Sequence, residues 1–231
     1  MAAATSVPEP MRRRRVLTIL VSAVLLLGCH RGGSNAPPPL IPVPDDLPGV
    51  YAASFPCSNC TEIAATLWLR ADQIFFLRQR YVGDGGAAND ASYAFGHWSW
   101  DEHTAEIVLQ GRGPSRRLKR LDSDRLDWLG SAPTRTTLHR DASAPAFEDR
   151  LVFDGESVVD DHGATFKQCV TGLKLPIADA GALKELRRQH RVLNPAHKVA
   201  LTTVDAHIVD IGAREHLVID KVIKLKPGAG C

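Results

Sequence analysis

The sequence lacks the residue patterns on which most enzymes depend. It contains no G-x-S-x-G motif, no glycine-rich nucleotide loop and no pair of carboxylates at a spacing that suggests a mechanism. Three histidines, His190, His207 and His216, fall on different expected elements and form no metal-ligand motif. These absences favour a protein that is not an enzyme.

Methionine is also scarce, because the only two methionines are Met1 and Met11. If the N-terminal segment is removed, as argued next, the remaining chain contains none. This excludes a copper carrier built from methionine clusters, although cysteine thiolates remain available as soft ligands for Cu(I).

The N-terminal segment is built like a secretory signal. Four arginines at 12–15 precede an apolar run at 16–27, which is too short to span a bilayer comfortably. The run ends in Leu26-Leu27-Gly28-Cys29, which resembles the lipobox of bacterial lipoproteins. That resemblance implies that residues 1–28 are a signal peptide and that Cys29 is lipidated and becomes the first residue. An ordinary signal peptide is the alternative, but no A-x-A-like cleavage site follows cleanly.

Lipidation implies a membrane partner and a location. Several acyl chains anchor a protein more firmly than one. By analogy with lipoprotein sorting in enteric bacteria, His30 after the cysteine, in place of aspartate, favours the outer membrane. The protein would then face the periplasm.

Cleavage before Cys29 also changes the charge balance. It removes four of the 28 basic residues and one of the 26 acidic residues, which leaves 24 against 25. A chain of nearly neutral charge predicts no nucleic-acid-binding surface.

The chain has five cysteines, an odd number that cannot all pair in disulfides. Lipidation of Cys29 would leave an even number. Without Cys29, the four that remain can all pair in an oxidising compartment. Of the three possible connectivities, the local spacing favours Cys57–Cys60 and Cys169–Cys231.

Residues 29–48 are rich in glycine and proline and are expected to form a tether. The first folded domain is expected at 49–141, where short apolar stretches alternate with turn residues. This pattern predicts about eight strands in an up-and-down β-barrel. The expected strands are 50–55, 63–69, 74–81, 93–100, 105–110, 116–121, 125–129 and 136–140.

Residues 147–231 predict a second small barrel. Expected strands at 151–153, 164–169 and 173–177 precede a helix at 180–190 with Asp179 as its N-cap, and strands at 199–211 and 217–225 follow it. Five strands with a helix between the third and fourth are typical of the OB-fold. The sequence therefore predicts an all-β protein with one helix.

Several stretches together resemble the NlpE family of copper-homeostasis and envelope-stress lipoproteins, in family order. They are 49–51 (GVY), 55–60 (FPCSNC), 66–69 (TLWL), 93–101 (YAFGHWSWD), 164–172 (ATFKQCVTG), 175–178 (LPIA) and 217–231. The resemblance implies a lipocalin-like barrel, a C-terminal OB-fold and a non-enzymatic outer-membrane lipoprotein. It also implies an inner-membrane stress-sensor kinase as partner.

The C-x-x-C motif of Cys57 and Cys60 admits three interpretations. The first, which the periplasm favours, is a disulfide. The second is a soft-metal site for Cu(I) in the reduced state, with His97 as a third ligand if the fold brings it near. The third is a thioredoxin-type dithiol, which requires a helix N-terminus that the flanking residues do not predict.

The sequence and the resemblance thus predict a lipoprotein for envelope stress sensing or copper homeostasis. Apart from Cu(I) at Cys57 and Cys60, no cofactor is expected. Two alternatives are a lipocalin-like carrier of a small ligand and a Cu(I)-binding periplasmic lipoprotein. A third is a structural lipoprotein of the cell surface that sends no signal.

Overall fold

The computed structural model describes residues 42–83, 91–130, 135–144, 149–160, 163–193 and 199–231. The predicted signal peptide, the lipidation site Cys29 and most of the expected tether lie outside this range. All of these residues belong to one structural unit, which begins at Ile41 and ends at Cys231. In that part of the chain, no helix is long and apolar enough to cross a membrane.

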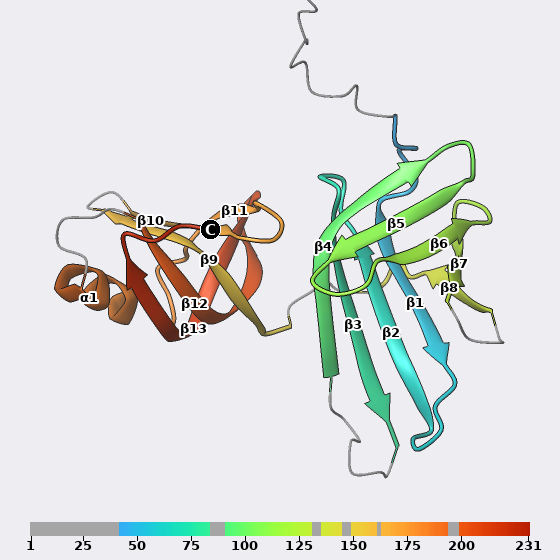
Figure 1. Ribbon diagram of the computed structural model, residues 1–231, viewed down its shortest axis with the longest axis horizontal. Helices are drawn as coiled ribbons and strands as arrows, with labels where there is room; N and C mark the ends of the chain where they lie inside the picture. Colours follow the sequence, from blue (N-terminus) through green and yellow to red (C-terminus); the bar gives the residue numbers. More distant parts are fainter. Residues whose placement is uncertain (1–41, 84–90, 131–134, 145–148, 161–162, 194–198) are drawn as a thin grey trace, which may run out of the picture. The chain divides into compact units, whose positions relative to one another are not determined.

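Eight antiparallel strands close into an up-and-down barrel, as the sequence predicts (Figure 1). They are β1 (Gly49–Phe55), β2 (Glu62–Leu69), β3 (Ile74–Val82), β4 (Ala91–Asp101), β5 (Glu106–Gly111), β6 (Arg116–Arg120), β7 (Arg125–Leu129) and β8 (Thr136–Arg140). Each strand pairs with its neighbour in sequence, and β1 pairs with β8 to close the ring. Each described strand of the barrel thus has a neighbour on both sides, although β1 pairs with β8 only at Tyr51 and Ala52, and β4 pairs with β5 only from Gly96 onward.

The interior of the barrel is filled by side chains. Alternate residues of the strands point inward and pack into one apolar cluster. Trp98 and Trp100 of β4 both belong to it, as their two-residue spacing predicts, and the indole nitrogen of Trp98 donates to the Arg70 carbonyl oxygen at 3.0 Å. The core is completed from the N-terminal side by Leu47, whose side chain is buried.

Arg140 fixes the seam where the barrel closes. It lies opposite Tyr51 across the β1–β8 pair and its guanidinium donates to the Tyr51 hydroxyl at 2.5 Å. The same side chain donates to the carbonyl oxygens of Pro48 and Ser123 at 3.0 and 2.9 Å. Tyr51 in turn donates to the Leu47 carbonyl at 2.8 Å, so one arginine joins the seam to the segment that enters it.

The second sheet has five strands in the order β11-β10-β9-β12-β13. They are β9 (Leu151–Asp160), β10 (Gly163–Gln168), β11 (Lys174–Pro176), β12 (Val199–Ile211) and β13 (Arg214–Pro227), with α1 (Leu183–Leu193) between β11 and β12. Ile177 makes a parallel bridge to Leu217, which brings the end of β11 onto β13. This order, this closure and the position of α1 are those of an OB-fold, so the predicted fold class is confirmed.

Two local predictions for this part of the chain are wrong. The strand expected at 151–153 continues to Asp160, because its alternating residues pair with both β10 and β12. The helix begins at Leu183 instead of 180, and Asp179 is not its N-cap. Gly181 has a φ of +54°, which a helix cannot accommodate, and the Ala182 N–H donates to the Ile219 carbonyl at 2.6 Å.

The sequence predicts that the first domain ends at 141 and the second begins at 147, and these positions lie between β8 and β9. Residues 145–148 lie outside the described part, and the two domain boundaries stay predictions.

Candidate functional site

The loop between β1 and β2 carries the C-x-x-C motif. A disulfide joins Cys57 to Cys60, with 1.96 Å between the sulfurs and 5.3 Å between the Cα atoms. Pro56 precedes the loop and fixes the backbone φ where β1 ends. Both cysteines are half-buried, so the bond lies at the surface of the barrel and not in its core.

The end of β3 holds this loop in place. The Thr61 N–H donates to the Val82 carbonyl at 2.7 Å. Gly83 follows with a φ of +139°, and a Cβ there would come within 2.8 Å of the Thr61 nitrogen. Glycine at this position therefore allows the backbone of the C-x-x-C loop to lie close to the next hairpin.

The surroundings of the motif differ from those of a thioredoxin dithiol. Strands flank it on both sides, so no helix N-terminus is available to lower a thiol pKa. Cys60 Sγ lies 3.4 Å from the Glu62 carbonyl oxygen, which carries a partial negative charge.

His97 lies far from the two cysteines. It pairs with Ile74 at one end of β3, whereas the C-x-x-C loop contacts Val82 at the other end. Val82 is eight positions after Ile74, which is about 26 Å at the usual rise per residue. The condition under which His97 would serve as a third ligand is therefore not met. In the described ranges, no group of three or more histidine, cysteine or acidic side chains is arranged to hold a metal ion.

The C-terminal OB-fold carries the second disulfide, between Cys169 and Cys231. The sulfurs are 2.08 Å apart and the bond spans 62 positions of sequence. Cys169 is held by its N–H, which donates to the Asp154 carbonyl at 2.9 Å. The Cys231 N–H donates to a Glu156 carboxylate oxygen at 3.0 Å, so β9 contacts both halves of the bond. Cys231 is exposed, which makes this disulfide accessible to a reductant.

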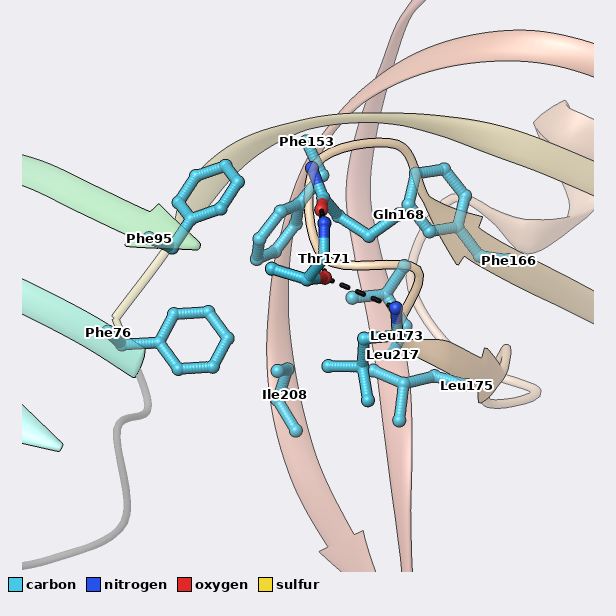
Figure 2. Close-up of a pocket in the computed structure, with 10 residues that line it drawn as sticks. All are labelled: Phe76, Phe95, Phe153, Phe166, Gln168, Thr171, Leu173, Leu175, Ile208 and Leu217. Carbon is cyan, nitrogen blue, oxygen red and sulfur yellow. Dashed lines mark hydrogen bonds between the residues drawn. The ribbon is translucent and has the colours of Figure 1, made fainter. Parts of the chain in front are cut away.

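A compact turn positions the chain around Cys169. The Gln168 side-chain oxygen accepts from the Val170 and Thr171 N–H groups at 2.8 and 2.6 Å, and from the Thr171 hydroxyl at 2.9 Å. The Leu173 N–H donates back to the Thr171 hydroxyl oxygen at 3.2 Å, as Figure 2 shows. Gln168 and Thr171 are both buried, so these bonds satisfy polar groups that water does not reach.

The same domain contains a buried polar cluster that sequence reasoning missed. Ser157 Oγ lies 2.8 Å from His190 Nε2 and 2.5 Å from Thr202 Oγ1. Burial lowers the pKa of His190. Two patterns pointed to this cluster: His190 follows Leu183 and Leu186 on one helix face, and Thr202 occupies a buried position in the alternation of β12.

This cluster combines a hydroxyl with an imidazole, as in nucleophilic catalysis, but its position gives it a structural role. Ser157 and Thr202 have no exposed surface, so no substrate reaches them. His207, another histidine without a motif, lies on β12 with its Nδ1 2.7 Å from an Asp220 carboxylate oxygen on β13. Among the described residues, the two disulfides are the groups open to thiol–disulfide exchange.

Residues 51–137, which make up nearly all of the barrel, match the family model of the NlpE N-terminal domain. This barrel is similar to the NlpE N-terminal domain. The resemblance to the NlpE family stated from the sequence is thereby confirmed.

The similarity to NlpE proteins extends beyond the barrel. The chain is 23% identical over 240 residues to lipoprotein NlpE of Escherichia coli strain K12, covering 96% of this chain and 98% of that protein. Among solved structures, the crystal structure of the Cpx pathway activator NlpE from Escherichia coli matches with a TM-score of 0.36 and 22% identity, covering 80% of this chain and 98% of that one. A candidate lipoprotein from Shewanella oneidensis matches with a TM-score of 0.34 and 26% identity, covering 42% and 91%.

Proposed function

We propose that this protein is a non-enzymatic lipoprotein of the outer membrane that acts in envelope stress sensing and copper homeostasis. The observation that carries the proposal is the C-x-x-C disulfide on an NlpE N-terminal barrel. The similarity to lipoprotein NlpE along nearly the whole chain supports it.

The anchor follows from the lipobox sequence. Cys29 carries the acyl chains, and residues 29–48 let the folded part stand away from the membrane on its periplasmic side. The partner that receives the signal is a stress-sensor kinase of the inner membrane.

The redox chemistry of the two disulfides supplies the input. A bond that is accessible or strained is reduced more readily than a buried structural one. Cys231 is exposed and Cys169 half-buried, so failure of disulfide formation in the periplasm changes this bond directly.

Mass spectrometry of the mature protein tests the anchor and the cysteines together. We expect a diacylated Cys29 at the N-terminus, no thiol that alkylates without reduction, and four thiols after reduction. A mature chain that begins upstream of position 29, or four free thiols in the untreated protein, would contradict the proposal.

A stress-response reporter tests the signalling role. We expect a raised output when the Cys169→Ser, Cys231→Ser variant replaces the wild type, and an unchanged output for Ser99→Ala, which alters an exposed strand residue. An identical output from wild type and variant under both oxidising and reducing conditions contradicts this role.

Copper binding is tested separately on the reduced protein. Two thiolates from one C-x-x-C loop offer soft ligands for one Cu(I) ion. We expect stoichiometric Cu(I) binding in competition with a chelator, lost in Cys57→Ala and retained in Cys231→Ala. Equal Cu(I) affinity in all three proteins would rule out the motif as the copper site.

A further inference from the structure

The outer face of the barrel carries a row of aromatic side chains. Trp68 of β2 lies opposite Phe76 of β3, and Phe76 lies opposite Phe95 of β4. The ring centroids are 5.7 Å apart in the first pair and 6.1 Å apart in the second. We call these three residues the aromatic row. Outward positions of an antiparallel barrel usually face water, so an apolar row there marks an interaction surface.

The OB-fold supplies the side chains that cover this row. Phe153 of β9 lies 5.4 Å from Phe95, centroid to centroid, and Phe76 is only 2% exposed. Figure 2 shows Phe76 and Phe95 pointing toward Phe153 and Ile208. The space left between these side chains is about 10 Å³, which is no more than one water molecule needs.

Three ion pairs surround this apolar contact, and they share one polarity. Every arginine comes from the NlpE barrel and every carboxylate from the region that follows it: Arg70 with Glu215, Arg78 with Asp149, and Arg112 with Asp154. The Arg70–Glu215 pair is bidentate, the geometry in which guanidinium and carboxylate groups interact most strongly, whereas Arg78 contacts both Asp149 oxygens through the single nitrogen Nη1.

The ion pairs differ in their access to solvent. The Arg70 side chain is 10% exposed, whereas that of Arg112 is 67% exposed. Arg70 also lies over the Trp68 ring, 4.9 Å from its centroid, so it links the aromatic row to Glu215. The apolar centre is small and the attraction at its edge is electrostatic, which makes the contact sensitive to screening by salt.

We propose that this contact is a salt-sensitive joint, in which the OB-fold conceals the aromatic row at low ionic strength and releases it as ionic strength rises. The charges support this because in each of the three pairs the cation is on the barrel and the anion is on the region that follows it, so screening weakens the three pairs together. The screening length falls from about 30 Å at 0.01 M salt to about 3 Å at 1 M. The released row would fit a partner that, like the OB-fold, has an apolar centre and an acidic rim. The joint does not depend on the function proposed above.

Small-angle scattering and tryptophan fluorescence of the full mature chain test the joint. Between low and high sodium chloride we expect the radius of gyration to increase and the emission of Trp68 to shift to the red. A Trp68→Phe variant identifies the part of the emission change that belongs to this residue. A radius of gyration that is constant across the salt range would overturn the proposal.

Charge reversal tests the same joint without salt. We expect Glu215→Arg or Asp149→Arg to enlarge the molecule at low ionic strength, and Arg78→Glu combined with Asp149→Arg to restore its compact size. Arg117→Gln is the matched control, because the Arg117 partner Glu106 lies in the same barrel. Circular dichroism establishes that each variant is folded. Failure of the double reversal to restore the size, or an equal expansion in the control, would contradict the joint.

Discussion

Ser157 Oγ lies 2.8 Å from His190 Nε2, and both groups are buried between α1 and the C-terminal sheet. The two groups share a hydrogen bond in which the imidazole tautomer sets which of them donates. Burial of a charge at this position is unfavourable, so the cluster holds α1 against the sheet most firmly when His190 is neutral.

This relationship predicts how the stability of the OB-fold changes with pH. Burial lowers the folded-state pKa of His190 from its ordinary value of 6.5. The unfolded chain therefore binds more protons in mildly acid solution, so the stabilisation is complete above pH 6.5 and is lost as the pH falls toward the folded-state pKa.

We expect the free energy of unfolding to decrease by up to about 1.4 kcal/mol per pH unit below pH 6.5 from this group. Urea unfolding at a series of pH values measures it. His190→Gln should remove most of this slope, whereas His103→Gln, at an exposed position, should leave it unchanged. An identical slope in wild type and His190→Gln would show that another group is responsible.

Removal of the Ser157 hydroxyl should destabilise the same domain. Ser157→Ala removes the hydroxyl that contacts His190 Nε2 in a site that water does not reach, whereas the Thr202 hydroxyl keeps its bond to the Ala200 carbonyl. We expect a loss of about 1–3 kcal/mol in the free energy of unfolding. Ser99→Ala on the exposed face of β4 is the control, with an expected change of less than about 0.5 kcal/mol.

The two disulfides should contribute unequally to stability. In the chain-entropy model, closing a loop with a separation of 62 residues contributes about 4 kcal/mol, and closing one of three residues about 2 kcal/mol. We therefore expect Cys169→Ser, Cys231→Ser to lower the free energy of unfolding about twice as much as Cys57→Ser, Cys60→Ser. Denaturant titration of both double variants measures the two losses. A larger loss in Cys57→Ser, Cys60→Ser would contradict the loop-length argument.

Gly96 of β4 should not tolerate a side chain. A Cβ at this position would overlap the Gln110 carbonyl oxygen and approach the Gly111 Cα to 2.7 Å on the paired strand β5. We expect Gly96→Ala to lower the thermal unfolding midpoint of the barrel by several degrees, since overpacking typically costs about 1–3 kcal/mol. Gly163→Ala is the control, because nothing lies within 4 Å of its added Cβ. Equal midpoints for both variants would contradict this reading.

Much of the fold could be predicted from local pattern. The eight barrel strands follow from short apolar stretches between turn residues such as Asp122-Ser123-Asp124, which join β6 to β7 in the structure. The OB-fold follows from the position of one helix between the third and fourth strands of the C-terminal part.

Other features could not be found from local pattern. The length of β9 depends on partners on both sides, and the start of α1 depends on a hydrogen bond from Ala182 to the distant Ile219. Strand pairing also decides that His97 lies at the opposite end of β3 from the cysteines.

The sequence by itself determined the order of elements, the closed barrel and the NlpE resemblance, because these depend on periodicity, turn chemistry and short motifs that act over a few residues. Only the tertiary structure decided that Ser157, His190 and Thr202 meet in the core, and that three arginines of the barrel face three carboxylates beyond it. These contacts join residues from 33 to 145 positions apart, and such partners are selected by packing and burial of the whole chain.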